Sequence, residues 1–342
     1  MVTLTEIAKI TGFSVNTVSL ALRDSPRISQ KTRKQIQEMA GKMKYRPNRL
    51  ARQFCLQRTN TVGLVVPAIE VAIFPGITAG VESILSSKDL SLILCVSHDD
   101  PEKEAKELEL LMEMNVAGII AAPAQENPNI DLMHEIIQRQ IPLVMIDRFL
   151  PEVASYFVGT NDKYMAYSNI EYLIKLGHRN IGFLVGPRNT YTANERLIGY
   201  KEALEKYGIE YREDHLAGWG FYEEYGAQGI KELLRLQPVP TAIFCINDHV
   251  AIGAMKTLLR LGLKIPDQIS ITCFFEGISV VNELLSTPMT GVQQPSYLLG
   301  KIAAEILLDL INKVKTPKIE KIIVPSKFVY GSSCKELHSP QL

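Results

Sequence analysis

The chain contains few of the residues that build metal centres, redox pairs or disulfide frameworks. Its five cysteines are scattered through 342 residues, and no two have the spacing of a metal or redox motif. We expect them to be small core residues in a reducing compartment. The six histidines are thinly spread, with no Ser/His/Asp order and no glycine-rich phosphate loop. We therefore expect no enzyme, no metal and no cofactor.

Long apolar runs are also missing. None approaches the roughly 20 residues that a membrane helix needs. The first ten positions carry polar and charged residues, so no signal peptide is expected. A hydrophobic fraction of 46% with 22% charged residues suits a globular protein of two or three domains. We expect a cytoplasmic protein with no membrane partner.

Charge is unevenly distributed. Residues 1–60 carry 12 Lys and Arg against three Asp and Glu, whereas the remainder carries 25 basic and 34 acidic residues. A basic head on an acidic body indicates a polyanionic partner for the head. The alternative is a solvated basic surface without a partner.

The first 45 residues have the pattern of three short helices. Thr3 and Glu6 have capping-box spacing, Gly12 interrupts the pattern, and Ser14 and Ser29 can cap two further helices. The expected apolar faces are Leu4, Ile7, Ala8 and Ile10 on the first helix, Val18 and Leu22 on the second, and Ile36, Met39, Ala40 and Met43 on the third. Two short helices joined by a tight turn predict a helix-turn-helix.

The second helix is the expected DNA reader. Asn16 can contact a base edge bidentately, most simply adenine, while Val15 and Leu20 can pack on thymine methyl groups. Hydroxyls and arginines at the helix ends can bind phosphates. A solvated helix residue is the alternative for Asn16. The expected DNA contacts of the head are Thr5, Ser14, Val15, Asn16, Thr17, Leu20, Arg23 and Arg27.

From residue 61 onward, short apolar runs alternate with amphipathic stretches. Strands are expected at 62–66, 92–96, 117–121, 143–146, 181–185, 242–246 and 269–274. Helices are expected at 102–114, 162–176, 193–207, 223–236 and 248–261. This alternation predicts two parallel sheets covered by helices, with equivalent halves starting at 62 and 181. A ligand would lie in a cleft at the carboxyl ends of the strands.

Several stretches together resemble one family. Thr-Leu-Thr-Glu-Ile-Ala-Lys at 3–9, Ser-Val-Asn-Thr-Val-Ser at 14–19 and Tyr-Arg-Pro-Asn-Arg-Leu-Ala-Arg at 45–52 are similar to the N-terminal region of the lactose/galactose-repressor (LacI/GalR) family of bacterial transcription regulators. Leu-Gly-His-Arg-Asn-Ile at 176–181 and Glu-Arg-Leu-Ile-Gly-Tyr at 195–200 extend the resemblance into the body.

The resemblance implies a domain plan and a partner. It implies a helix-turn-helix domain at 1–46, a hinge at 47–60 and a type I periplasmic-binding-protein-like body at 61–340. The N-lobe would hold about 61–160 and 293–322, and the C-lobe about 161–292 and 323–340, with three crossovers. It further implies a homodimer on a pseudo-palindromic operator DNA and a nucleoid-associated location. Without an extra C-terminal helix, we expect no tetramer.

The hinge departs from the family at one position. Residues 49–54 can form a helix that is too short to be stable alone in water. In the family, two such helices pair in the minor groove and a Leu from each wedges into the central base step. Phe54 stands at that position here, and a linker residue packed on the body is the alternative. The implied hinge contacts are Arg49, Leu50, Arg52 and Phe54.

The resemblance also implies a small-molecule effector, a sugar or other metabolite. The implied contacts are Phe74, Asp147, Tyr191, Thr192, Arg196, Phe221, Asn247 and Phe275, with Phe74, Tyr191, Thr192 and Phe221 on cleft loops. The alternatives are Arg196 as a structural ion-pair residue, Asp147 paired with Arg148 or another lobe residue, and Phe74 and Phe221 as aromatics that only pack the loops. Phe275 stands where the family has an Asp that binds sugar hydroxyls. We therefore expect a less hydroxylated, partly apolar effector, with an anionic group for Arg196.

Two other functions fit parts of the chain. The body alone would suit a solute-binding protein, although the basic head argues against it. A protein partner could also replace the small effector in controlling the head.

Overall fold

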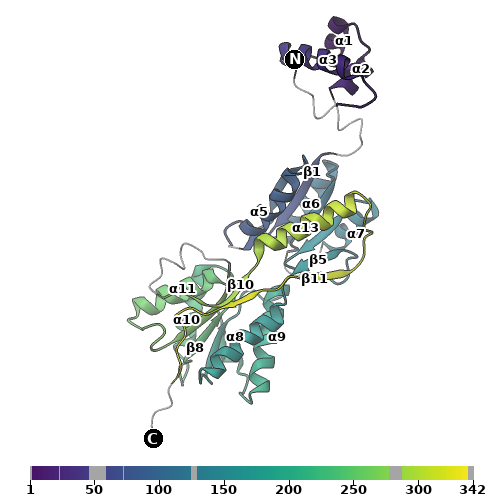
Figure 1. The fold of residues 1–342 in the computed structure, drawn as a ribbon. Coiled ribbons are helices and arrows are strands. Elements are labelled where there is room, and N and C mark those ends of the chain that lie inside the picture. The colour runs from purple at the N-terminus through teal and green to yellow at the C-terminus, as the bar shows by residue number, and fades with distance from the viewer. Residues whose placement is uncertain are drawn as a thin grey trace. The chain divides into compact units, whose positions relative to one another are not determined.

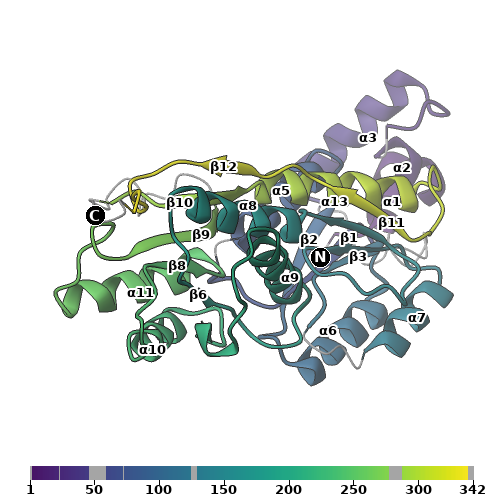
Figure 2. The ribbon, with the colours of Figure 1, turned by 90° about the horizontal axis from the view of Figure 1, so that it is seen from below.

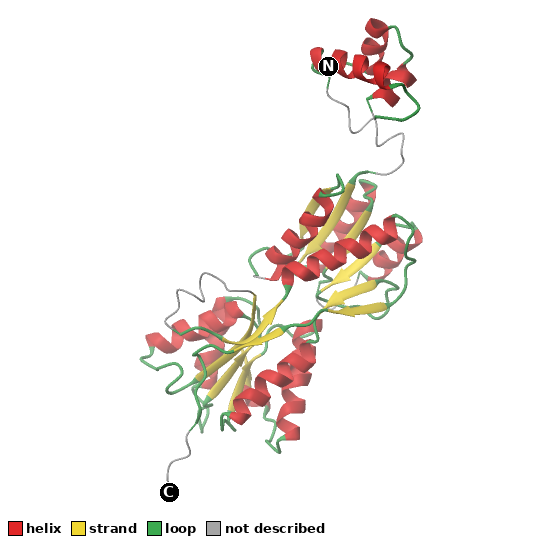
Figure 3. Cartoon of the chain, viewed as in Figure 1, coloured by secondary structure: helices red, strands yellow, loops and turns green. Residues whose placement is uncertain are grey.

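The structure is a computed structural model that describes residues 2–22, 24–45, 59–71, 73–124, 129–276 and 287–337. The chain divides into two compact units, Met1–Arg58 and Thr59–Leu342, and each is described by itself. The first unit is helical, and the second has two lobes, each with a central sheet between helices (Figures 1 and 3).

The head consists of α1 (Leu4–Thr11), α2 (Val15–Ala21) and α3 (Gln30–Lys42). The capping box is present: the Thr3 N–H donates to Glu6 Oε2 at 2.8 Å, and the Glu6 N–H donates to Thr3 Oγ1 at 3.3 Å. The hydrogen bond with the Thr3 backbone and, to a smaller extent, the one with the Thr3 side chain lower the pKa of Glu6. The Ser29 hydroxyl accepts from the Thr32 N–H at 3.3 Å and caps α3.

The prediction that Ile10 belongs to the apolar face of the first helix is wrong. Ile10 is 56% exposed, whereas Ile7 and Val18 are fully buried. At 100° per residue, Leu4, Ile7 and Ala8 share one stripe of α1, and Ile10 falls outside it. The buried core of the head is Ile7, Ala8, Val18, Ala21, Ile36 and Ala40.

The N-lobe sheet has the order β11-β5-β4-β3-β1-β2, with every pair parallel. Its strands are β1 (Thr61–Val66), β2 (Ser91–Val96), β3 (Gly118–Ala121), β4 (Leu143–Ile146), β5 (Tyr156–Gly159) and β11 (Glu320–Ile323). On one face α5 (Ile73–Ser86) packs beside α13 (Ser296–Ile311); on the other lie α6 (Pro101–Glu113) and α7 (Ile130–Gln138) (Figures 1 and 2). Side chains of β1 alternate between these two cores: Leu64 joins the first and Val65 the second.

The C-lobe sheet has the order β12-β10-β9-β8-β6-β7. Its strands are β6 (Ile181–Leu184), β7 (Leu216–Ala217), β8 (Ala242–Cys245), β9 (Ser270–Glu276), β10 (Thr290–Gln294) and β12 (Lys327–Val329). The helix pair α8 (Asp162–Lys175) and α9 (Tyr191–Lys206) covers one face, and α10 (Glu223–Leu233) with α11 (Asp248–Arg260) covers the other (Figure 2). β12 alone runs antiparallel, against β10.

The two sheets repeat one topology. The order β2-β1-β3-β4-β5 in the N-lobe corresponds to β7-β6-β8-β9-β10 in the C-lobe, so the expected equivalence of residues 62 and 181 is confirmed. The chain crosses between lobes after β5, after β10 and after β11. Strand pairing places Gln294 in the C-lobe sheet and Ile323 in the N-lobe sheet, a shift of one or two residues from the expected limits. Among the described residues no helix is long and apolar enough to cross a membrane.

Candidate functional site

The second helix of the head presents its first turn to solvent. Val15 is 42% exposed and Asn16 is also exposed, while Val18 is buried against the other two helices. Leu20 is half-buried, Thr5 and Arg27 are exposed, and Thr17 is half-buried. The helix therefore offers one amide and one branched apolar side chain to whatever lies against it.

The hydroxyls at the start of α2 are already engaged with one another. Ser14 Oγ accepts from the Thr17 N–H at 3.1 Å, and the two side-chain oxygens lie 2.8 Å apart. Ser14 thus caps the helix, and because the contact between the two hydroxyls uses one of their two hydrogens, one hydroxyl hydrogen remains to donate to a phosphate. The other predicted contacts, Arg23, Arg49, Leu50, Arg52 and Phe54, lie outside the described residues.

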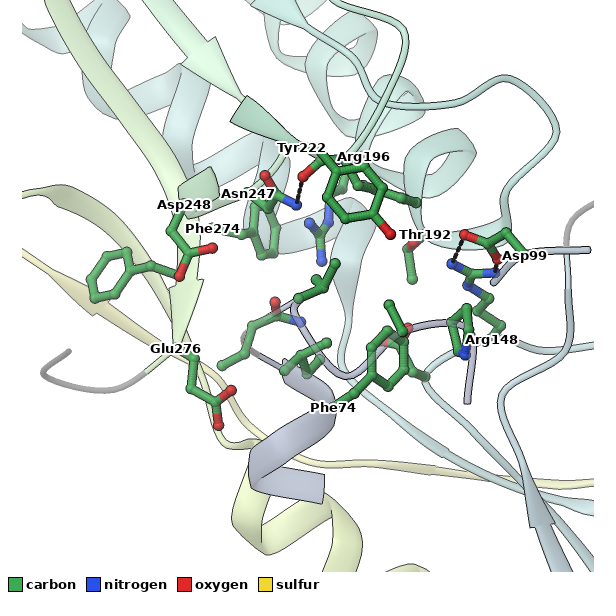
Figure 4. Close-up of a pocket in the computed structure, with 18 residues that line it drawn as sticks. Phe74, Asp99, Arg148, Thr192, Arg196, Tyr222, Asn247, Asp248, Phe274 and Glu276 are labelled. Carbon is green, nitrogen blue, oxygen red and sulfur yellow. Dashed lines mark hydrogen bonds and ion pairs between the residues drawn. The ribbon is translucent and has the colours of Figure 1, made fainter. Parts of the chain in front are cut away.

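A pocket lies where the carboxyl ends of the two sheets meet (Figure 4). Its volume is about 580 Å³, counted out to its solvent-facing mouth. Residues just after β1, β2 and β4 line it from the N-lobe, and the ends of β8, β9 and β10 line it from the C-lobe. Its polar lining consists of Asp99, Asp147, Arg148, Thr192, Arg196, Tyr222, Asn247, Asp248, Glu276 and Gln294.

Both arginines of the lining are neutralised by the protein itself. Arg196 pairs with Asp162 through Nη2 at 2.6 Å and Nε at 2.7 Å, donates to the Ile246 carbonyl, and lies 3.6 Å from the ring centroid of Phe274. Arg148 binds both carboxylate oxygens of Asp99, the pair drawn with dashed lines in Figure 4. Neither guanidinium is left as a free cation.

The carboxylate of Asp147, unlike the two arginines, is unpaired within the described residues. It follows β4 with a left-handed backbone (φ 64°) and is 7% exposed, and its carboxylate has no hydrogen bond within the described parts of the chain. Burial raises the pKa of Asp147 to about 6, with the charge of Asp162 adding to the shift and Arg148 and Arg196 opposing it. The alternative of an Asp147–Arg148 pair is wrong, since Arg148 pairs with Asp99.

Two further carboxyl groups lie at the C-lobe end of the pocket. Burial, and then the charge of Asp248, raises the pKa of Glu276 to about 8, and burial also raises the pKa of Asp248. Glu276 Oε2 and Gln294 Nε2 are buried without a partner in the described structure. Asn247 is engaged at both ends: its oxygen accepts from the Val250 N–H and its amide donates to the Phe221 carbonyl, each at 2.9 Å.

The apolar lining is rich in aromatic rings, as expected. It includes Phe74, Phe221, Phe274 and Phe275, and the Tyr222 ring joins them. The Arg148 guanidinium of the N-lobe lies 5.8 Å from the Phe221 ring centroid of the C-lobe, so the lining spans both lobes.

Three residues expected on cleft loops lie on helices instead. Phe74 is in the first turn of α5, and Tyr191 and Thr192 begin α9. Phe74 and Thr192 line the pocket, but Tyr191 is not part of its described lining. The half-buried Tyr191 ring instead packs edge-on against Phe149 and Phe157 of an N-lobe core.

The residues expected from the sequence include four of the ten polar residues that line the pocket, and six were missed. Asp99, Asp248, Glu276 and Gln294 all lie at or just after the carboxyl end of a strand. Since ligands of parallel sheets bind at these ends, the polar residue that follows each predicted strand was the available signal. Arg148 and Tyr222 each neighbour an expected residue.

Comparison with known proteins covers both units. The model described as "Bacterial regulatory proteins, lacI family" matches residues 3–48, and "Periplasmic binding proteins and sugar binding domain of LacI family" matches residues 59–332. The HTH-type transcriptional regulator DegA of Bacillus subtilis (strain 168) is 30% identical, over 98% of this chain and 99% of its own length. The HTH-type transcriptional regulator GalR of Escherichia coli (strain K12) is 31% identical, over 95% and 94%.

A solved structure agrees with the body. A LacI family transcriptional regulator from Enterococcus faecium with bound ribose superposes with a TM-score of 0.70 at 28% identity, covering 81% of this chain and 100% of that chain.

Proposed function

This chain belongs to the LacI family of bacterial regulatory proteins, and on that premise we propose that it is a repressor. Its affinity for operator DNA is set by a small molecule in the pocket between its lobes. The observation that carries the proposal is the pairing, in one chain, of an exposed reading helix with a pocket lined from both lobes. It acts in the cytoplasm on nucleoid DNA, with no catalytic step.

The reading helix supplies the sequence specificity. Asn16 contacts a base edge and Val15 packs on a thymine methyl group, while Ser14, Thr17 and Arg27 position the head on phosphates. Leu20 and Thr5 complete this surface. The hinge residues Arg49, Leu50, Arg52 and Phe54 contact the minor groove, with Phe54 as the wedge.

The pocket controls this head through lobe movement. A ligand that contacts Asp147 of the N-lobe and Thr192, Asn247 or Phe275 of the C-lobe favours one arrangement of the lobes, because its differential contacts shift the equilibrium between arrangements. Two copies of the chain form a dimer with two-fold symmetry, which matches a pseudo-palindromic operator. A tetramer found by light scattering would contradict the dimer.

Operator selection from random DNA tests the proposal with the full chain. We expect a pseudo-palindrome to be enriched, with binding that weakens steeply as salt rises. Asn16→Ala should lower operator affinity roughly 10- to 100-fold, the effect of losing one bidentate base contact, and relax the preference at one position in each half-site. Gln35→Ala, an exposed substitution on α3, is the matched control and should change affinity less than about twofold.

The outcomes separate the competing functions. No selected sequence together with tight metabolite binding would indicate a solute-binding protein. A selected operator whose binding responds to a partner protein, and to no small molecule, would indicate control by protein contact.

A further inference from the structure

We infer that the molecule taken up by the inter-lobe pocket carries a cationic group, such as a protonated amine, held between the unpartnered carboxyl groups and the aromatic rings of the lining. This inference rests on the proposed effector role of the pocket and specifies the chemical class of the effector. It reverses the sequence-based expectation of an anionic group for Arg196.

Both arginines of the lining already have a carboxylate partner in the protein, and one guanidinium donor, the Arg148 Nε, is buried without a partner in the described residues. Arg196 is committed to Asp162, the Ile246 carbonyl and the Phe274 ring, and both it and Asp162 have side chains at most 5% exposed. Arg148 is committed to Asp99 and to the Pro123 carbonyl at 3.1 Å. An anionic ligand that took either guanidinium as its counter-charge would compete with these carboxylates, and leaving one of them alone is unfavourable.

Some carboxyl groups of the lining have no partner in the described structure after both arginines are paired. Asp147 is buried, lines the pocket and has no hydrogen bond within the described structure. At the other end, Glu276 Oε2 is buried without a partner in the described residues, and the charge of nearby Asp248 contributes to the raised pKa of Glu276. A bound cation would favour the ionised form of the Glu276 carboxyl. A buried carboxylate needs a counter-charge or a donor, and the ligand is what can supply one.

Much of the remaining lining of the pocket is aromatic. Phe74, Phe221, Phe275 and Tyr222 are rings of the same lining. Aromatic faces attract cations through their quadrupoles, and rings combined with carboxylates are the recurring surroundings of bound ammonium groups. Figure 4 shows Phe74 and Tyr222 facing the pocket from opposite lobes, with Asp248 and Glu276 along one side.

A neutral polyol and a metal ion fit these walls less well. Polyol hydroxyls can donate to Asp147, but they bring no counter-charge for its carboxylate. No group of three or more His, Cys, Asp or Glu in the described residues is placed to hold a metal ion. An organic cation satisfies the carboxyl groups and the rings together.

The test compares ligands that differ by one group. Thermal unfolding of the full chain would be measured with glucosamine, glucose, N-acetylglucosamine and glucuronate, and with putrescine against 1,4-butanediol. We expect at least one amine to raise Tm by about 2 °C or more at millimolar concentration, with at least tenfold tighter binding than its neutral partner. Stabilisation by a neutral or anionic partner equal to or greater than that of the amine would overturn the inference, as would no response to any amine.

Variants locate the cation. Asp147→Asn and Glu276→Gln keep side-chain size while removing charge, and either should lower the preference for the amine over its neutral partner at least fivefold. Asp214→Asn, which removes an exposed carboxylate paired with Arg212 outside the pocket, is the matched control and should keep the preference. Unchanged preference in both pocket variants would overturn the inference.

Operator binding distinguishes this inference from the function on which it rests. If a neutral sugar, and no amine, changes operator affinity, the regulatory proposal stands and the cationic ligand is wrong. If the amine binds in the pocket and operator affinity does not change, the effector role is wrong while the charge preference stands.

Discussion

The reading helix and the inter-lobe pocket differ in how far apart their functional residues lie in the sequence and in how deeply these residues are buried. On α2, the chemistry lies within one short stretch, and its key side chains Val15 and Asn16 are exposed. In the pocket, the chemistry comes from segments as far apart as Asp99 and Gln294, and most of it is buried. Removing an exposed group that makes no contact within the protein should therefore cost binding alone, whereas removing a buried group should also cost stability.

The largest effect should come from breaking the buried ion pair beneath the pocket. Arg196→Met leaves Asp162 buried and unpaired, and we expect the body to lose about 3–5 kcal/mol of unfolding free energy. The double variant Arg196→Met with Asp162→Leu should recover most of this loss, because no isolated charge remains. Chemical denaturation followed by circular dichroism measures both.

A surface pair provides the control for this substitution. Lys163→Met breaks the exposed pair with Glu202 and should cost no more than about 1 kcal/mol. Equal losses in the single and double Arg196 variants would show that shape, and not charge, holds this part of the pocket.

A substitution in the core of the head should lower its free energy of unfolding nearly as much as loss of the ion pair lowers that of the body. Ile36 is fully buried in the small core of the head, and Ile36→Ala should cost about 2–5 kcal/mol. A unit this small has little stability to spare, so the head should unfold while the body melts as before. Amide hydrogen exchange resolves the two units, and protection retained in α1 and α3 would contradict the prediction.

The pocket should make stability depend on pH in a way that the head does not. The pKa of Glu276 rises from 4.5 to about 8 on folding, so the folded body binds more protons than the unfolded chain between these values. The stabilisation is present below about pH 4.5 and is lost as pH rises through 8. From pH 5 to 8, the wild type should lose roughly 1–2 kcal/mol more than Glu276→Gln, after allowance for the partial exposure of the side chain.

Urea unfolding at several pH values measures this difference. Glu305→Gln, an exposed substitution on α13, should follow the wild-type profile. Parallel profiles for the wild type and Glu276→Gln would mean that Glu276 titrates normally in the folded body.

The smallest expected effect is at the start of the reading helix. Ser14→Ala removes the cap that accepts from the Thr17 N–H and should cost the head about 1 kcal/mol. Ser14→Asp keeps a capping oxygen but adds a negative charge, so it should preserve stability and weaken DNA binding. Anisotropy titration with operator DNA separates the two effects; equal operator affinities for the two variants would remove Ser14 from the phosphate contacts.

Local patterns predicted much of the fold because their causes are local. The capping box of Thr3 and Glu6 forms as its spacing predicts, and the strand predicted at 143–146 is observed as β4. Strands β5, β7, β10, β11 and β12 were not predicted. Two of them, β7 and β12, have only two and three residues, which carry too little pattern. Ile10 was misassigned because a spacing of three residues can fall on either edge of a helical stripe.

The sequence by itself determined the three-helix head, the repeated parallel sheets and the position of the pocket at the strand ends, since periodicity, capping and strand order follow from neighbours along the chain. Only the tertiary structure decided how the pocket is charged. It joined Arg196 to Asp162 and Arg148 to Asp99 across 34 and 49 positions, and left Asp147 buried with no hydrogen-bond donor among the residues that the structure describes. Such pairing depends on distances that arise only when the lobes fold, and no local pattern contains them.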